Sequence, residues 1–200
     1  MPHFPLTELA KSLPGVVGIR LEAEPRFEVV EKLGELEVRR YLPEARAQVR
    51  LPGSRSEALD AAFEVLAGYL FGKNVERREM SMTVPVYAEP VVEARGSEWI
   101  VSFFLSNDQV PAELPQPEDS RVQLVRTPER YVASLRYTGN NTEEHAAECS
   151  DRLLAALRQQ SHYLASGAPY FCQYDAPFTV PFLKRNEVHV PLHEPGASRS

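Results

Sequence analysis

A pattern of residues that occurs twice constrains the fold of this chain more than any other feature. Ala47-Gln48-Val49-Arg50-Leu51-Pro52-Gly53 and Ala133-Ser134-Leu135-Arg136-Tyr137-Thr138-Gly139 share small, apolar, basic and glycine positions. In each copy we expect a strand, then a helix, a strand broken by proline and a closing strand. Two such units related by a pseudo-twofold axis can bury the apolar faces of their sheets together. The seam between the copies is then a natural ligand site.

The repeat predicts one body made of two βαββ units, and the proline-rich stretch between them reads as a surface loop. The expected segments are an N-terminal arm (1–26) lying on the domain or partly disordered, a single domain (27–192) and a C-terminal tail (193–200). Within the domain we expect repeat one over about 27–106, the linker over 107–120 and repeat two over about 121–192.

Helical periodicity appears once in each half. Apolar residues recur at spacings of four, three and four from Leu59 to Leu70, after possible caps at Ser54 or Ser56 and before a glycine stop. Asn140-Asn141-Thr142 precedes a second stretch with an approximate 3.6-residue period. We expect the two helices to be equivalent.

Composition excludes several classes of protein. With 43% hydrophobic and 25% charged residues, and with no apolar run near the roughly 20 residues that cross a bilayer, we expect no membrane span. Since a signal peptide is not evident either, we expect a cytoplasmic location.

The net charge of −6, with both signs interspersed, argues against nucleic acid as a partner. Two cysteines support neither a disulfide framework nor a zinc site. No common catalytic motif is present, so enzymatic activity has no motif support.

Three groups of segments resemble the SOUL family of haem-binding proteins, over about Phe27 to Leu192. These are Phe27-Glu28-Val29-Val30 to Glu37-Val38-Arg39-Arg40-Tyr41, then Tyr69-Leu70-Phe71-Gly72-Lys73-Asn74 with Met82-Thr83-Val84-Pro85-Val86, and Tyr174-Asp175-Ala176-Pro177-Phe178 with Arg185-Asn186-Glu187-Val188. The resemblance implies an α+β fold, a distorted antiparallel β-barrel with two long helices packed on the outside, and tetrapyrrole binding. The duplicated unit also resembles GyrI-like effector-binding domains, which take up small, often cationic or aromatic molecules.

The resemblance implies haem or another porphyrin as cofactor. In one branch of the family a histidine just before the tyrosine of the first repeat is proposed as the axial ligand, and this chain has Arg40 there, so we expect no strong axial ligand. His189 is the histidine embedded in a family motif and is the candidate metal ligand, with a partly exposed strand histidine as the alternative.

Hydrophobic docking needs no iron ligand, because a porphyrin can bury its flat apolar area while basic groups meet its propionates. In Met80 to Val86 we expect the two methionines and the two valines to share one face, and Phe63, Leu66 and Leu70 with Met80, Met82 and Val84 form the candidate apolar wall. Lys73, Lys184 or Arg185 could supply the cation. An ordinary helix-on-sheet core is the alternative interpretation of this wall. The candidate cofactor-binding residues are Phe63, Leu66, Leu70, Met80, Met82, Val84, Tyr174, Phe178, Arg185 and Glu187.

Glu187 is the candidate residue for cation binding or acid/base catalysis. Alternation along the last strand puts Arg185, Glu187 and His189 on one face. If that row faces the cleft, a carboxylate beside an imidazole could hold a cation or act as a general acid/base. If it faces solvent, it is a salt-bridged surface row.

Three functional hypotheses follow. The first is a carrier or buffer for haem or porphyrin, a small hydrophobic or amphipathic ligand. The second is a GyrI-like pocket for a cationic or amphipathic molecule, with hydrolytic or detoxifying activity through Glu187. The third is an interaction domain without a small ligand.

Overall fold

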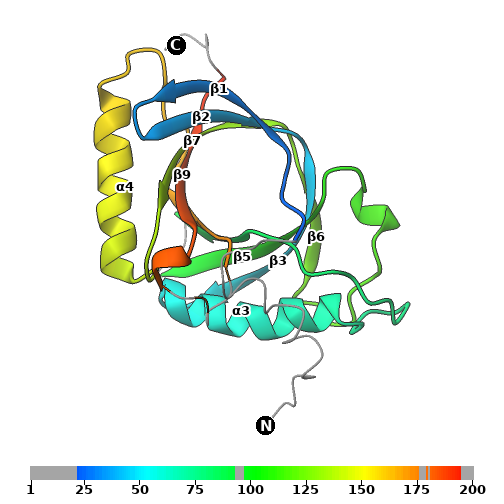
Figure 1. Cartoon of the computed structure of the whole chain (residues 1–200). Coiled ribbons are helices and arrows are strands. Elements are labelled where there is room, and N and C mark those ends of the chain that lie inside the picture. The colour runs from blue at the N-terminus through cyan, green and yellow to red at the C-terminus, as the bar shows by residue number, and fades with distance from the viewer. Residues whose placement is uncertain (1–21, 93–96, 176–178, 180, 195–200) are drawn as a thin grey trace.

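A computed structural model describes residues 22–92, 97–175, 179 and 181–194. Over these residues the chain forms an antiparallel nine-stranded sheet that curls into a distorted barrel, with two long helices on its outside (Figure 1). The α+β barrel expected from the sequence is therefore confirmed. Its elements are β1 (Phe27–Leu33), β2 (Leu36–Tyr41), β3 (Glu44–Pro52), α3 (Arg55–Leu70), β4 (Val86–Pro90), β5 (Glu98–Ser106), η1 (Pro111–Glu113), β6 (Gln123–Thr127), β7 (Arg130–Tyr137), α4 (Glu143–Arg158), β8 (Tyr170–Gln173), η2 (Pro181–Leu183) and β9 (Asn186–Leu192).

The two repeats exchange strands. The sheet has the order β1-β2-β7-β9-β8-β4-β5-β3-β6, with β8 and β4 paired antiparallel at its centre. β2 belongs to the first half of the chain but pairs with β7, and β6 belongs to the second half but pairs with β3. The β1-β2 hairpin of the first repeat thus extends the strands of the second repeat, and β6 of the second repeat extends the strands of the first. The exchange explains why two sequence repeats form one body.

Both helices begin at side-chain caps. Ser54 and Glu57 form a capping box at the start of α3, and the Thr142 hydroxyl accepts a hydrogen bond from the backbone N–H of His145 at the start of α4. Each helix has 16 residues. Among the helices that the structure describes, none is long and apolar enough to cross a membrane.

The outer face of the sheet carries the apolar core. α3 packs on β3 and β5, and α4 packs on β7 and β9. Leu66 and Leu70 are fully buried beneath α3, while Leu153 with Val188 and Val190 is fully buried beneath α4. Burying such side chains contributes about 1.5–3 kcal/mol each.

The inner face is different, because a third cluster there is built on tyrosines. Its buried members are Tyr41, Tyr87, Phe104, Val132, Tyr170, Cys172 and Tyr174. Charged side chains lie between these rings, and several are as buried as the apolar core. The barrel interior is therefore the place where the fold concentrates polar chemistry.

The proline-broken segment of the first repeat differs from expectation. β4 begins only at Val86, directly after Pro85, which has no N–H to donate to a ladder. Met80 and Met82 pack against the core beneath α3, whereas Val84 packs against the interior tyrosine cluster. Because the backbone here is irregular, the period of two does not apply, and these side chains do not share one face.

Only part of the expected arm and tail can be placed. Residues 1–21 and 195–200 lie outside the described residues. The last residues of the arm lie on the domain, since Val84 N–H donates to the Ala23 carbonyl at 3.1 Å and Leu42 N–H donates to the Arg26 carbonyl at 3.0 Å.

Candidate functional site

The polar row of β9 faces the interior of the barrel. Glu187 and His189 are both 0% exposed, and their cross-strand partners on β8 are Cys172 and Tyr170. The sequence left open whether this row faces the inside or solvent, and the structure places it inside.

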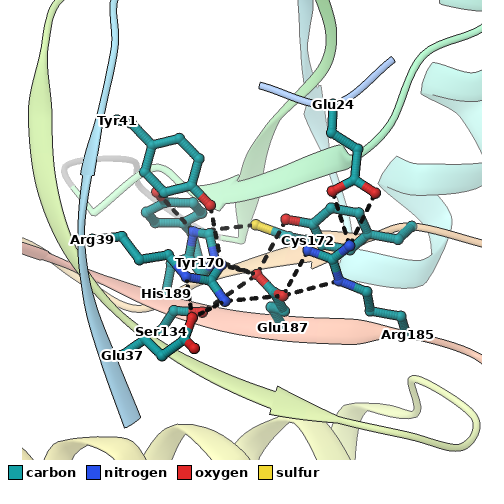
Figure 2. A network of polar contacts seen from close by, with 11 residues as sticks. Glu24, Glu37, Arg39, Tyr41, Ser134, Tyr170, Cys172, Arg185, Glu187 and His189 are labelled. Carbon is teal, nitrogen blue, oxygen red and sulfur yellow. Dashed lines mark hydrogen bonds and ion pairs between the residues drawn. The ribbon is translucent and has the colours of Figure 1, made fainter. Parts of the chain in front are cut away.

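Glu187 is the centre of the network shown in Figure 2. Its Oε2 accepts hydrogen bonds from Arg39 Nη1 at 2.6 Å and from His189 Nε2 at 2.9 Å. The Tyr174 hydroxyl at 3.1 Å and the Ser134 hydroxyl at 3.3 Å donate to the same oxygen. Its Oε1 accepts from Arg185 Nε at 3.0 Å and from Arg39 Nη2 at 3.4 Å. Both carboxylate oxygens are thus occupied by donors.

The protonation states follow from these contacts. Burial alone would raise the pKa of Glu187, but the hydrogen bond from His189 and the charge and hydrogen bonds of Arg39 hold that pKa well below its usual value. Burial lowers the pKa of His189, so the imidazole is neutral. With Glu187 as acceptor, Nε2 carries the proton, and Nδ1 accepts from the Tyr170 hydroxyl at 3.2 Å. Glu187 is an anion between two guanidinium groups.

Arg185 connects this network to the N-terminal segment. Its Nη1 lies 2.9–3.0 Å from both carboxylate oxygens of Glu24, and its guanidinium lies 3.6 Å above the centre of the Tyr174 ring. Figure 2 shows Arg185 between Glu24 and Glu187. Arg185 and Tyr174, both candidates from sequence, thus lie together with Glu187.

The network has the geometry of a structural element. A cation that approached Glu187 would have to displace guanidinium or hydroxyl donors, and both ring nitrogens of His189 have hydrogen-bond partners. In the described part of the chain no group of three or more His, Cys, Asp or Glu side chains could hold a metal ion. The contacts of Glu187 and His189 are thus those of a buried network within the barrel.

The apolar wall expected from sequence does not form one surface. Leu66 and Leu70 lie 0% exposed in the core beneath α3, while Val84 lies inside the barrel. Phe63 is 36% exposed and contacts the Phe103 ring edge to face. Phe178 lies outside the described residues.

A cleft of about 450 Å³ lies instead where the two repeats meet, at the N-termini of α3 and α4; we call it the seam cleft. Both helices begin at this corner of the molecule (Figure 1). Its lining residues are Arg55, Ser56, Leu59, Asp60, Asn140, Asn141, Thr142, Gln173, Asp175, Lys184 and Asn186.

Arg55 holds the two helix N-termini together. The side chain is 2% exposed, donates from Nη1 to Asn141 Oδ1 at 2.8 Å, and donates from Nη2 to the Asn141 and Thr142 carbonyls at 3.0 Å. Its guanidinium also lies 4.4 Å above the Phe171 ring. The Nδ2 of Asn141 is buried and has no hydrogen-bond partner. A buried amide donor without a partner in the lining of a cleft indicates a place for an acceptor.

Apolar and basic groups lie next to this donor. Leu59 lines the cleft, and so does Lys184, whose Nζ lies 3.4 Å from Asn140 Oδ1. The two residues before Lys184 are Phe182, which is 74% exposed, and Leu183, which is 36% exposed. Neighbouring exposed apolar side chains mark candidate binding surfaces. Sequence reasoning recognised Asn140 to Thr142 only as helix caps and did not select Arg55, whose burial depends on the second repeat.

Comparisons with known proteins agree with the fold. A family model described as "SOUL heme-binding protein" matches residues 22–191. Heme-binding protein 2 of Mus musculus is 26% identical over 157 residues, which cover 76% of this chain and 75% of the mouse protein. Among solved structures, the EcmrR C-terminal domain is similar with a TM-score of 0.59 and 11% identity, over 82% of this chain and 99% of that one. A hydrolase from Listeria innocua has a TM-score of 0.56 and 10% identity, over 82% and 94%. At these identities the solved structures support the fold alone.

Proposed function

The chain belongs to the SOUL haem-binding protein family, and from this premise we propose that it binds haem or a related porphyrin in the seam cleft, as a carrier or buffer. The observation that carries the proposal is the combination, at one cleft, of an apolar side chain, a lysine and an unpartnered buried amide donor, with the exposed ring of Phe182 two residues before that lysine in the chain. A porphyrin needs a flat apolar contact together with donors for its propionates.

The lining residues fit this group. Leu59 offers apolar area, and Lys184 and Asn141 Nδ2 offer a charge and a hydrogen-bond donor to a carboxylate. Exposed Phe182, two residues before Lys184 in the chain, would extend the apolar contact. The N-termini of α3 and α4 add the positive ends of two helix dipoles, which favour anionic groups. The lining also holds two acidic side chains. The negative charge of Asp60 would repel a propionate, whereas Asp175 accepts a hydrogen bond from the Arg185 backbone N–H at 2.6 Å.

The proposal relies on apolar contact and charge rather than on iron coordination. The described lining of the cleft contains Arg, Ser, Leu, Asp, Asn, Thr, Gln and Lys side chains, and none of these is a usual axial ligand of haem. Haem, when bound, would supply its iron and its conjugated ring. The chain itself would shield one face of the ring and hold the propionates. Reversible uptake of this kind suits a carrier better than a redox catalyst.

The decisive experiment compares haemin with iron-free protoporphyrin IX by absorbance and fluorescence titration. Because the cleft provides contact but no ligand to iron, we expect saturation near one equivalent and similar affinities for the two compounds. A protoporphyrin affinity far weaker than that of haemin would show that the iron is ligated and would contradict the proposed mode.

Variants locate the site. Phe182→Ser removes an exposed ring, and burial of about 100 Å² at ~25 cal/mol per Å² corresponds to roughly 2.5 kcal/mol, an upper limit of about 60-fold in affinity. Lys184→Glu should weaken binding and Asp60→Asn should strengthen it. Lys73→Glu is the matched control, because Lys73 lies at the other end of α3. Loss of affinity in Lys73→Glu, with unchanged affinity in Lys184→Glu, would place the porphyrin near the C-terminal end of α3 and contradict binding in the seam cleft.

The second hypothesis, a cationic molecule held by Glu187, is not favoured by the geometry. Arg39 and Arg185 already neutralise this carboxylate, and neutral donors occupy the rest of it. The contacts favour a structural role for Glu187.

A further inference from the structure

Glu143 joins the N-termini of the two long helices at the seam cleft. It is the first residue of α4, and its side chain reaches the start of α3, which belongs to the other repeat. Glu143 Oε1 accepts from the Ser56 backbone N–H at 3.3 Å, and Oε2 accepts from Arg55 Nε at 3.4 Å. Arg55 and Ser56 both line the cleft of about 450 Å³. A carboxylate of the protein itself therefore lies against two lining residues of this cavity.

The position that Glu143 occupies suits a carboxylate from any source. The first N–H groups of a helix have no partner within the helix. In α3 the Ser54 hydroxyl accepts from the N–H of Glu57, and Glu143 accepts from the N–H of Ser56. The positive end of the helix dipole and the guanidinium of Arg55 both favour an anion here. Neither of them distinguishes a side chain from a ligand.

Glu143 is held loosely in this position. Its two contacts measure 3.3 and 3.4 Å, whereas charge-assisted hydrogen bonds are typically about 2.7–2.9 Å long. Its side chain is 50% exposed. Ion pairs at such exposed positions contribute little to stability. The carboxylate can therefore turn into solvent at a small cost.

Arg55 keeps its place without Glu143. Its side chain is 2% exposed, and its Nη1 and Nη2 donate to Asn141 Oδ1 at 2.8 Å and to the Asn141 and Thr142 carbonyls at 3.0 Å. Within the described part of the chain, Glu143 is the carboxylate that forms an ion pair with Arg55. Because a buried charge without a counter-charge is unfavourable, departure of Glu143 favours the entry of another carboxylate.

We propose that Glu143 is a tethered competitor of the ligand in the seam cleft. Its carboxylate occupies the anion position between Arg55 Nε and the Ser56 N–H, and a carboxylate of the ligand binds there by displacing it into solvent. The inference rests on the proposed function for the identity of the ligand, whose carboxylates are the propionates of a porphyrin. Competition of this kind lowers the affinity and favours release, which suits a carrier.

Fluorescence titration of protoporphyrin IX into the full chain tests the competition. Glu143→Ala removes the competitor and should bind about three- to fivefold more tightly, the range that corresponds to a weak exposed ion pair. Glu144→Ala is the matched control, because Glu144 lies in the same first turn of α4, has the same charge and interacts with its own backbone and Thr142. We expect its affinity to change less than about twofold. Glu143→Gln keeps the shape of the side chain and should give a smaller gain than Glu143→Ala.

Propionate, a single carboxylate without a ring, tests the anion position separately from porphyrin binding. In amide NMR spectra we expect it to shift the Ser56 signal of Glu143→Ala at lower concentration than that of the unmodified chain. If protoporphyrin IX does not saturate but propionate shows this difference, the proposed function fails and the role of Glu143 is supported.

Two results would overturn the role of Glu143. The first is that protoporphyrin IX saturates the unmodified chain, so that the proposed function stands, but Glu143→Ala binds it no more tightly than Glu144→Ala does. The second is that propionate shifts the Ser56 signal equally, or not at all, in Glu143→Ala and in the unmodified chain.

Discussion

Replacing Glu187 with Gln should destabilise the protein strongly although the two side chains have the same shape. The substitution removes the negative charge between Arg39 and Arg185, whose side chains are only 6% and 12% exposed. It also places an amide NH₂ where one oxygen now accepts, so that donors face donors. Glu187→Gln thus leaves buried positive charge with less compensation.

The magnitude follows from what remains. Removing one partner of a buried ion pair typically costs 3–5 kcal/mol. Here Arg39 keeps Glu37, with Nη2 to Oε2 at 2.8 Å, and Arg185 keeps Glu24 at 2.9 Å. Each arginine therefore retains one carboxylate, and we expect the lower end of the range, about 3 kcal/mol.

Urea denaturation followed by far-ultraviolet circular dichroism measures this difference. With a slope of about 2 kcal/mol per M, the midpoint should fall by about 1.5 M. Glu98→Gln is the control, because it removes an equivalent contact to Arg50 at the surface and should leave the midpoint unchanged. A loss below about 1 kcal/mol in Glu187→Gln, or equal losses in the two variants, would refute the view that the network stabilises the barrel.

Three further predictions concern stability. The folded-state pKa of His189 is lowered from about 6.5, so the unfolded chain binds more protons below that value, and the free energy of unfolding should fall as the pH drops through 6.5. In denaturation at pH 7.5 and 5.5, His189→Asn should reduce this dependence of the free energy of unfolding on pH. Leu66→Ala should lower the free energy of unfolding, measured in urea, by about 2–5 kcal/mol, because the side chain is fully buried between α3 and the sheet and its removal leaves a cavity. A decrease as small as that of a substitution at an exposed position would contradict this burial. Ser54→Ala should cost about 1 kcal/mol by removing the N-cap of α3, while Ser54→Asp should restore most of it.

Local patterns in the sequence were sufficient for the helices and for most strands. The first helix was read from the spacing between Leu59 and Leu70, and the second from caps at Asn140 to Thr142; both are present as expected. Hydrophobic periodicity depends on neighbours within one element, so it survives without knowledge of the rest of the chain. The pattern failed at Met80 to Val84, where tertiary contacts fix an irregular backbone.

The candidate sites show what such local patterns cannot predict. Alternation placed Arg185, Glu187 and His189 on one face, but it could not tell which side of the sheet that face would meet. Phe63, Leu66 and Leu70, the helical part of the apolar wall, were selected from helical spacing. The same spacing is produced by a closed core such as the one around Leu66 and Leu70. Helical periodicity alone cannot distinguish a buried core from a ligand wall.

By itself the sequence determined the duplicated unit, its two helices, and the fact that Arg185, Glu187 and His189 share one face near the last strand. Each of these features depends on residues a few positions apart. Tertiary structure alone decided the exchange of β2 and β6 between repeats, the partners of Glu187 and the cleft at the helix N-termini. Arg39 and Glu187 are 148 positions apart, and Arg55 and Asn141 are 86 apart. The physical reason is that charges separated so far along the chain become neighbours only after the two repeats have paired their strands.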